Sequence, residues 1–143
     1  MKREFKTALE KRRLIKFPEG AGLVSRELGA AKEDLDEARD RLAKGRFKYA
    51  TITAYYSMFH SARALLYHAG YREKSHHYLL VAIEALYVDE KRLLPELARD
   101  LRNAMILREE ADYHGEFSES GARSVLNSAE RFLDAAKHLL ARI

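Results

Sequence analysis

Apolar residues recur at intervals of three and four along most of the chain, which is the spacing of one face of an α-helix. This pattern predicts helices near residues 28–42, 47–69, 75–87, 94–115 and 118–140. No segment alternates between apolar and polar positions with turn signals at its ends, so the sequence predicts no β-sheet. The expected fold class is therefore all-α, an antiparallel bundle of four to five helices.

Glycine, serine and proline mark where the predicted helices begin and end. Gly45, Gly70 and Gly115 each follow an amphipathic segment, where glycine commonly terminates a helix. Ser75 is a suitable N-cap for the third helix, and Pro95 suits the first turn of the fourth. We therefore expect short loops between neighbouring helices.

A break at Pro18–Gly22 separates a basic N-terminal arm, residues 1–17, from a single helical domain of residues 18–143. The arm has seven basic and two acidic residues, a net charge of +5, whereas the other 126 residues carry a net charge of −1. The +4 charge of the whole chain therefore belongs to the arm. Basic charge clustered in this way can attract nucleic acid.

The apolar face of the arm is thin, because only Phe5, Leu9 and Leu14 contribute to it. A helix with so little apolar surface gains little from packing. We expect residues 1–14 to form a helix that becomes ordered only against a partner.

The composition of the 143 residues, 47% hydrophobic and 34% charged, is that of one globular domain. There is no cysteine, which excludes a disulfide framework, a cysteine-based zinc site and a thiol nucleophile. No apolar run approaches the roughly 18 residues of a membrane span, and the N-terminus lacks the apolar stretch of a secretory signal. We therefore expect a cytoplasmic protein that does not associate with membranes.

The six histidines are not spaced for a metal site. His76 and His77 are adjacent, whereas two histidines that bind one metal from a helix are four residues apart. Motifs for phosphate-binding loops and nucleophile elbows are also missing. We therefore expect neither a metal nor a cofactor.

The aromatic residues Tyr55, Tyr56 and Phe59 have two interpretations. Aromatic side chains among basic residues can stack on bases of single-stranded nucleic acid. However, these three fall at helical core spacing, which favours packing in the core.

Arg108 is the most informative residue, because it continues the apolar face of the fourth predicted helix. Asp112 follows by four residues and can pair with it on the same face. His114 comes six residues after Arg108, directly before Gly115. The carbonyl groups of the helix end, and Glu110 one turn earlier, favour the imidazolium form of His114.

An arginine and a histidine can cleave RNA without a metal. The 2′-hydroxyl loses a proton and attacks the neighbouring phosphate, the leaving 5′-oxygen gains a proton, and a guanidinium holds the phosphate. One histidine cannot be acid and base at once, but a symmetric dimer would supply two histidines and two arginines to one cleft.

Two sequence blocks carry a resemblance to a known family. They are Ala54–Leu66 followed by Gly70 and Ser75–His76, and Pro95–Leu97 leading to Leu107–Tyr113. With these blocks, the chain resembles the HEPN family over roughly residues 24–140, specifically the branch that is paired with minimal nucleotidyltransferases.

The resemblance implies a homodimeric helical bundle that is a metal-independent, RNA-cleaving toxin, with an R-x(4–6)-H motif from each subunit at a shared cleft. The matching catalytic positions are Arg108 and His114, with five residues between them, supported by Asp112 and Tyr113. It also implies a nucleotidyltransferase antitoxin, which in some pairs adenylylates a tyrosine near the motif. Tyr113 is the matching tyrosine.

Glu109 departs from the family pattern, which often has Asn or Asp directly after the arginine. A carboxylate at this position would repel the scissile phosphate. This favours an alternative function, a non-catalytic module that binds a nucleotidyltransferase or a nucleotide. A third function left open is that of a helical adaptor that binds nucleic acid through residues 1–17.

Overall fold

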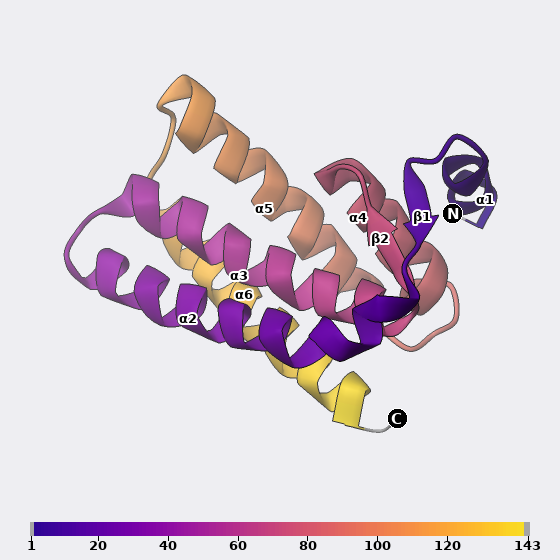
Figure 1. Ribbon diagram of the computed structural model, residues 1–143. Helices are drawn as coiled ribbons and strands as arrows, with labels where there is room; N and C mark the ends of the chain where they lie inside the picture. Colours follow the sequence, from indigo (N-terminus) through magenta and orange to yellow (C-terminus); the bar gives the residue numbers. More distant parts are fainter. Residues whose placement is uncertain (1, 142–143) are drawn as a thin grey trace.

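The computed structural model describes residues 2–141 and confirms the all-α fold class. These residues form six α-helices, one short pair of strands and two irregular helical turns, whose arrangement can be followed in Figure 1. In chain order they are α1 (Lys2–Glu10), β1 (Leu14–Lys16), η1 (Pro18–Leu23), α2 (Val24–Ala43), α3 (Phe47–His68), β2 (Tyr71–Glu73), α4 (His76–Ile83), η2 (Glu84–Val88), α5 (Pro95–His114) and α6 (Glu119–Ala141). The five predicted helices of the bundle are therefore present, close to their predicted bounds.

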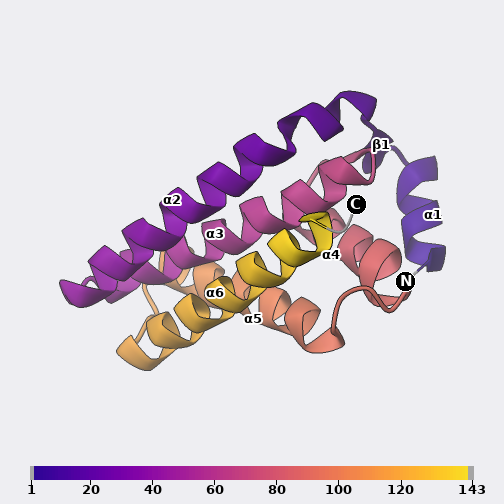
Figure 2. The same ribbon diagram turned by 90° about the horizontal axis from the view of Figure 1, so that it is seen from below.

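Helix α3 is the centre of the bundle. It packs against α2, α5 and α6, and Figures 1 and 2 both place it between α2 and α5. Most residues of α3 are buried, and away from its ends only one row along the helix, which includes Tyr56 and His60, is half-buried, as is typical of a helix packed among others. Small residues make this close packing possible: the Ser57 hydroxyl is buried and donates a hydrogen bond of 2.8 Å to the backbone carbonyl of Ala31 on α2.

The two strands were not predicted, and the expectation that the chain has no sheet was wrong. β1 and β2 pair in antiparallel orientation, with Leu14 opposite Glu73 and Lys16 opposite Tyr71. Each strand has only three residues, which is too short for an alternating pattern to show. Their pairing joins segments more than 50 residues apart, which local sequence does not reveal.

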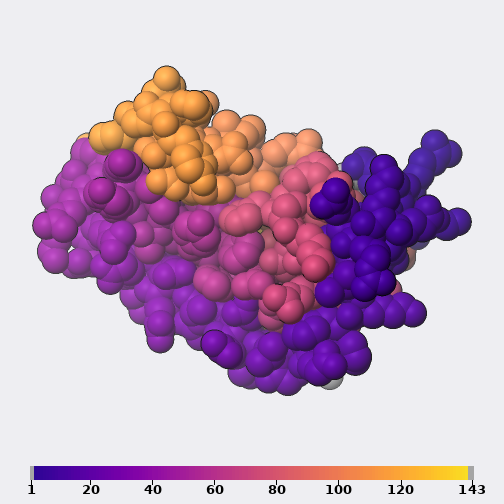
Figure 3. All heavy atoms as spheres, turned by 45° about the horizontal axis from the view of Figure 1, so that its top comes forward, coloured from indigo at the N-terminus to yellow at the C-terminus, as the bar shows by residue number. Residues whose placement is uncertain are grey.

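The N-terminal arm packs on its own chain, so the expectation that it needs a partner was also wrong. Helix α1 contacts α4 and η2, Ala8 is buried there, and the ring of Phe5 meets the edge of the Tyr71 ring. The space-filling view in Figure 3 shows the arm in indigo lying directly against the β2 and α4 region. The pairing of β1 with β2 holds the arm in place, which the thin apolar face of α1 could not do alone.

Within residues 2–141, no helix is long and apolar enough to cross a membrane.

The segment η2 is a single π-helical turn that continues α4, and it is held by a buried tyrosine. The Tyr87 hydroxyl donates a 2.6 Å hydrogen bond to the backbone carbonyl of Leu65 on α3. We expect Tyr87→Phe to lower the free energy of unfolding by about 1 kcal/mol, because the carbonyl loses a buried partner.

Urea denaturation followed by circular dichroism measures this change. Tyr49→Phe is the matched control, because Tyr49 is half exposed and its hydroxyl makes no hydrogen bond within residues 2–141. Equal stability of the two variants would mean that the Tyr87 hydroxyl contributes nothing.

Candidate functional site

The buried face of α5 includes an arginine. Leu97, Leu101, Ala104 and Ala111 point into the bundle, and Arg108 lies in the same row with only 7% of its surface exposed. A buried charge is costly unless neighbouring groups compensate for it. The surroundings of Arg108 therefore define the site.

Three tyrosine rings and one carboxylate surround the Arg108 guanidinium. Its central carbon lies 5.3 Å from the ring centre of Tyr55, 5.9 Å from that of Tyr56 and 5.6 Å from that of Tyr113. These are cation–π distances, which stabilise a partly desolvated cation. The Asp112 carboxylate lies 3.8 Å from Nη1, as the spacing of four predicts. We call Arg108, Tyr55, Tyr56 and Tyr113 the arginine cage.

The donors of this guanidinium are not used up inside the protein. The Nε atom of Arg108 is buried without a hydrogen-bond partner. The two terminal nitrogens make no hydrogen bond within residues 2–141 either. An arginine with free donors and weak charge compensation is suited to hold an oxyanion such as a phosphate.

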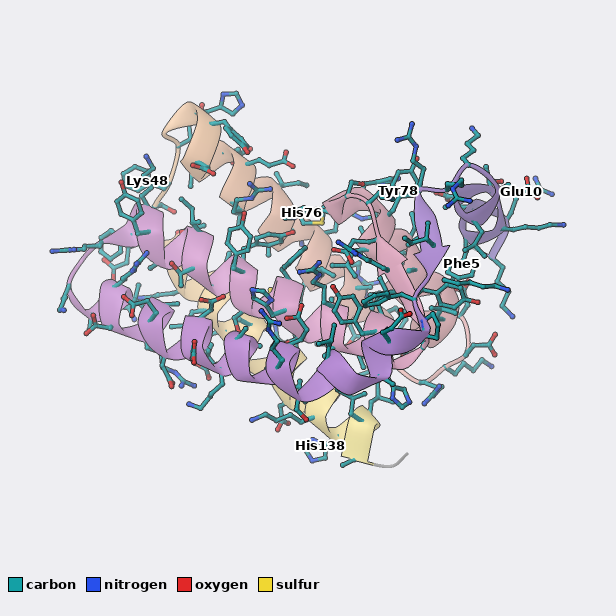
Figure 4. All side chains as sticks on the ribbon, in the orientation of Figure 1. Phe5, Glu10, Lys48, His76, Tyr78 and His138 are labelled. Atoms are coloured by element: carbon teal, nitrogen blue, oxygen red, sulfur yellow. The ribbon has the colours of Figure 1, made fainter. Side chains whose placement is uncertain are left out.

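A histidine that sequence reasoning set aside joins this site. His76 is the first residue of α4, and Ser75 caps that helix as predicted, accepting a hydrogen bond from the Tyr78 backbone N–H. The Nδ1 atom of His76 is hydrogen-bonded to the Tyr55 hydroxyl. Its ring lies beside the aromatic rings of α3, and Figure 4 labels His76 next to α5. The ring stacks on Phe59, with 4.6 Å between ring centres.

Burial keeps both members of the Tyr55–His76 pair uncharged at neutral pH, and nearby cations add to this effect only at His76. Burial, and then the positive charges of Arg108 and Arg63, lower the pKa of His76 below 6.5. Burial raises the pKa of Tyr55 far above its ordinary value, although Arg108 opposes this. The site therefore combines one fixed cation with a neutral imidazole.

A network of buried and half-buried charges lies beside Phe59. The Arg63 guanidinium lies 5.1 Å from the Phe59 ring centre, and Arg63 Nε is 3.0 Å from Glu73 on β2. Arg63 Nη1 is 3.4 Å from Glu27 on α2, and His60 Nδ1 lies 3.4 Å from the same carboxylate. The Phe59 ring therefore contacts both Arg63 and His76.

Two carboxylates in this network have shifted pKa values of opposite sign. Burial raises the pKa of Glu73, although Arg63 opposes this. Burial also disfavours ionised Glu27, but His60 and Arg63 outweigh it and hold the pKa of Glu27 below its usual value. The network therefore carries a firmly ionised carboxylate on α2 and a less readily ionised one on β2.

The structure places the predicted site residues in two groups. Arg108, Asp112 and Tyr113 lie together, and Tyr113 is 69% exposed while its ring touches the guanidinium. His114 is the last residue of α5 before Gly115, whose φ of 64° ends the helix. His114 is exposed and makes no hydrogen bond or ion pair within residues 2–141.

Tyr55 and His76 are the site residues that sequence reasoning missed. Tyr55 has the predicted core burial, with 1% exposure, but its ring also faces Arg108. The pair Ser75–His76 was part of the recognised sequence block, which is the signal that could have pointed to His76. Spacing along the chain could not, because Tyr55 and His76 are 21 residues apart.

Among residues 2–141, no group of three or more His, Asp or Glu side chains is placed to hold a metal ion. The site is therefore built from an arginine, aromatic rings and an uncharged histidine.

The protein is a small helical bundle. Its candidate site consists of an arginine surrounded by tyrosines, with a histidine beside it. Residues 24–139 match the HEPN domain family, and the chain belongs to that family. This agrees with the resemblance seen in the sequence blocks.

The curated relatives span most of the chain. A "UPF0332 protein" of Archaeoglobus fulgidus is 33% identical over 110 residues, which cover 76% of this chain and 87% of the relative. A Methanocaldococcus jannaschii protein named "Putative toxin" is 31% identical over 79% of this chain and 85% of its own length. A "UPF0332 protein" of Thermotoga maritima is 30% identical over 77% of this chain and 85% of its own length.

The lowered pKa of His76 predicts a pH dependence of stability. A folded-state pKa below the unfolded value of 6.5 means that unfolding takes up a proton. The free energy of unfolding should therefore fall as the pH drops below about 6.5, and this slope should be shallower in His76→Gln.

Urea titrations at pH values between 5 and 7 measure the slope. The matched control is His77→Gln, which removes the adjacent, exposed histidine. The same slope in wild type and His76→Gln would contradict the neutral, half-buried state of His76.

Proposed function

We propose that this protein is a metal-independent HEPN-type ribonuclease and the toxin of a HEPN–nucleotidyltransferase pair. The observation that carries the proposal is the Arg108 guanidinium, which is buried among tyrosines with its hydrogen-bond donors free. A relative of 31% identity carries the name "Putative toxin", which supports the biological part of the proposal. A cytoplasmic location, where RNA targets are present, belongs to the same proposal.

Arg108 binds the scissile phosphate and stabilises the negative charge that builds up on it. His114 acts as base for the 2′-hydroxyl or as acid for the leaving 5′-oxygen. The attack forms a bond from the 2′-oxygen to phosphorus and breaks the bond from phosphorus to the 5′-oxygen. The exposed position of His114 at the end of α5 suits a residue that works at a cleft shared with a second subunit.

The partners in this proposal are a second copy of the chain and a minimal nucleotidyltransferase antitoxin. Dimerisation supplies the second Arg108 and His114, and sedimentation would give twice the monomer mass of 16.5 kDa. Tyr113 is the proposed site of adenylylation, and its 69% exposure leaves the hydroxyl accessible to an enzyme. Because the Tyr113 ring contacts Arg108, a nucleotide on its hydroxyl would add a phosphate beside the guanidinium.

Purified protein should cleave labelled RNA in the presence of EDTA. Arg108→Ala and His114→Ala should each lower the rate by about 100-fold or more, because each removes a group that acts in the transition state. Arg99→Ala is the matched control, since Arg99 is exposed on the same helix and has no ion-pair partner within residues 2–141. Cleavage and toxicity that survive both site substitutions would refute the catalytic roles.

The second candidate function, a non-catalytic module, is favoured by Glu109. This exposed carboxylate directly follows Arg108 in the sequence. It raises the pKa of His76, whereas Arg108 lowers it. It would also repel a phosphate at the cage. Wild-type protein that cleaves no RNA but captures a nucleotidyltransferase through an Arg108-dependent contact would select this function.

The basic arm is proposed to supply electrostatic attraction to RNA. Deletion of residues 1–17 is a poor test, because it also removes β1 from its ladder with β2. Arg12→Gln combined with Arg13→Gln keeps the backbone and should lower the salt slope of RNA binding by about 1.4, since each of the two phosphate contacts contributes about 0.7. Lys44→Gln with Arg46→Gln is the control pair, and an equal effect of the two pairs would assign no special role to the arm.

A further inference from the structure

Tyr55 links the caged arginine to a histidine that has no role yet in the proposed cleavage. We propose that His76 is a further catalytic residue, a neutral imidazole that donates its Nε2–H to a non-bridging oxygen of the phosphate held by Arg108. The inference rests on the proposed function, and it assigns Tyr55 as the positioning residue that fixes the His76 tautomer. In this role His76 donates a hydrogen bond but transfers no proton.

The tautomer follows from the burial of the Tyr55 hydroxyl. Tyr55 is 1% exposed, and the only hydrogen-bond partner of its hydroxyl within residues 2–141 is Nδ1 of His76. A buried hydroxyl whose proton has no acceptor is costly, so the phenol donates and Nδ1 accepts. A neutral imidazole that accepts at Nδ1 carries its proton on Nε2.

The charge state follows from the groups around the ring. His76 is stacked on Phe59, and the cations of Arg108 and Arg63 both disfavour a further positive charge, with Glu109 as the opposing group. An imidazolium would also lose the hydrogen bond that Nδ1 accepts from Tyr55. His76 is therefore suited to donate a hydrogen bond as a neutral electrophile and not to act as a general acid.

Placement connects His76 to the arginine. The Tyr55 ring lies 5.3 Å from the Arg108 guanidinium, and the hydroxyl of the same ring holds His76. One tyrosine thus fixes both groups, from α5 and from α4. Nε2 of His76 makes no hydrogen bond within residues 2–141, and the side chain is partly exposed, so this donor is free for a ligand.

His77 shows that the arrangement is specific to one position. It is the next residue of the same helix, but it is exposed and its ring meets only the edge of Tyr78. The imidazole ring of His77 makes no hydrogen bond within residues 2–141. His77→Gln is therefore the matched control for every variant of His76.

The tautomer is tested by long-range 1H–15N NMR of the histidine side chains at pH 7. We expect the Nε2–H tautomer for His76, and a mixture of tautomers in Tyr55→Phe. A Nδ1–H tautomer or a charged His76 in the wild-type protein would overturn the inference. Addition of an RNA oligonucleotide with 2′-deoxy substitutions, which cannot be cleaved, should shift His76 Nε2, and no shift on saturation would also overturn it.

The catalytic role is tested by kinetics on RNA. His76→Ala should lower kcat by about 100-fold with a small change in KM, since a donor to the transition state is lost. His76→Gln should retain more activity than His76→Asn, because the Gln amide NH2 can reach the place of Nε2. Equal activity of wild type and His76→Ala would overturn the inference.

Failure of the proposed function has a different result. If wild-type protein binds the 2′-deoxy oligonucleotide but cleaves no RNA, the ribonuclease proposal fails. The NMR shift of Nε2 then still decides whether His76 contacts phosphate beside Arg108. A shift that disappears in Arg108→Gln would support that contact, and a shift confined to the other histidines would refute it.

Discussion

The structure depends on how one buried positive charge is accommodated. Arg108 occupies a core position of α5, and the desolvation of a guanidinium is offset only partly by an aspartate 3.8 Å away. The rest of the compensation comes from tyrosine rings, two of them on α3. The close packing of α3 against α5 therefore does two things at once. It forms part of the core, and it holds a cation whose nitrogens make no hydrogen bond within residues 2–141.

The small sheet and the buried charge network fix the other components of the site. β1 and β2 hold the chain directly before α4, and Glu73 at the end of β2 reaches Arg63 on α3. Arg63 and His76 both contact the ring of Phe59. The position of His76 is thus set by groups from the N-terminal arm, α3 and β2. Helix α1 packs against α4, which begins with His76. A segment far from Arg108 in sequence therefore helps to position a side chain of the same site.

Prediction from the sequence succeeded where neighbouring residues carry the information. The helices, the helix-ending role of Gly115 and the pairing of Arg108 with Asp112 all follow from spacings of a few residues. It failed for β1 and β2, whose three-residue strands contain no period and pair across the chain. It also discounted His76, because its partner Tyr55 lies in another helix.

The sequence by itself determined the all-α class, the helix bounds and the unusual arginine on an apolar face, because helical periodicity is a local property of the chain. Tertiary structure alone decided what surrounds that arginine. Three rings, a neutral histidine and a free set of donors meet there because α3, α4 and α5 pack together. Such contacts depend on the relative placement of helices, which no spacing within a single helix specifies.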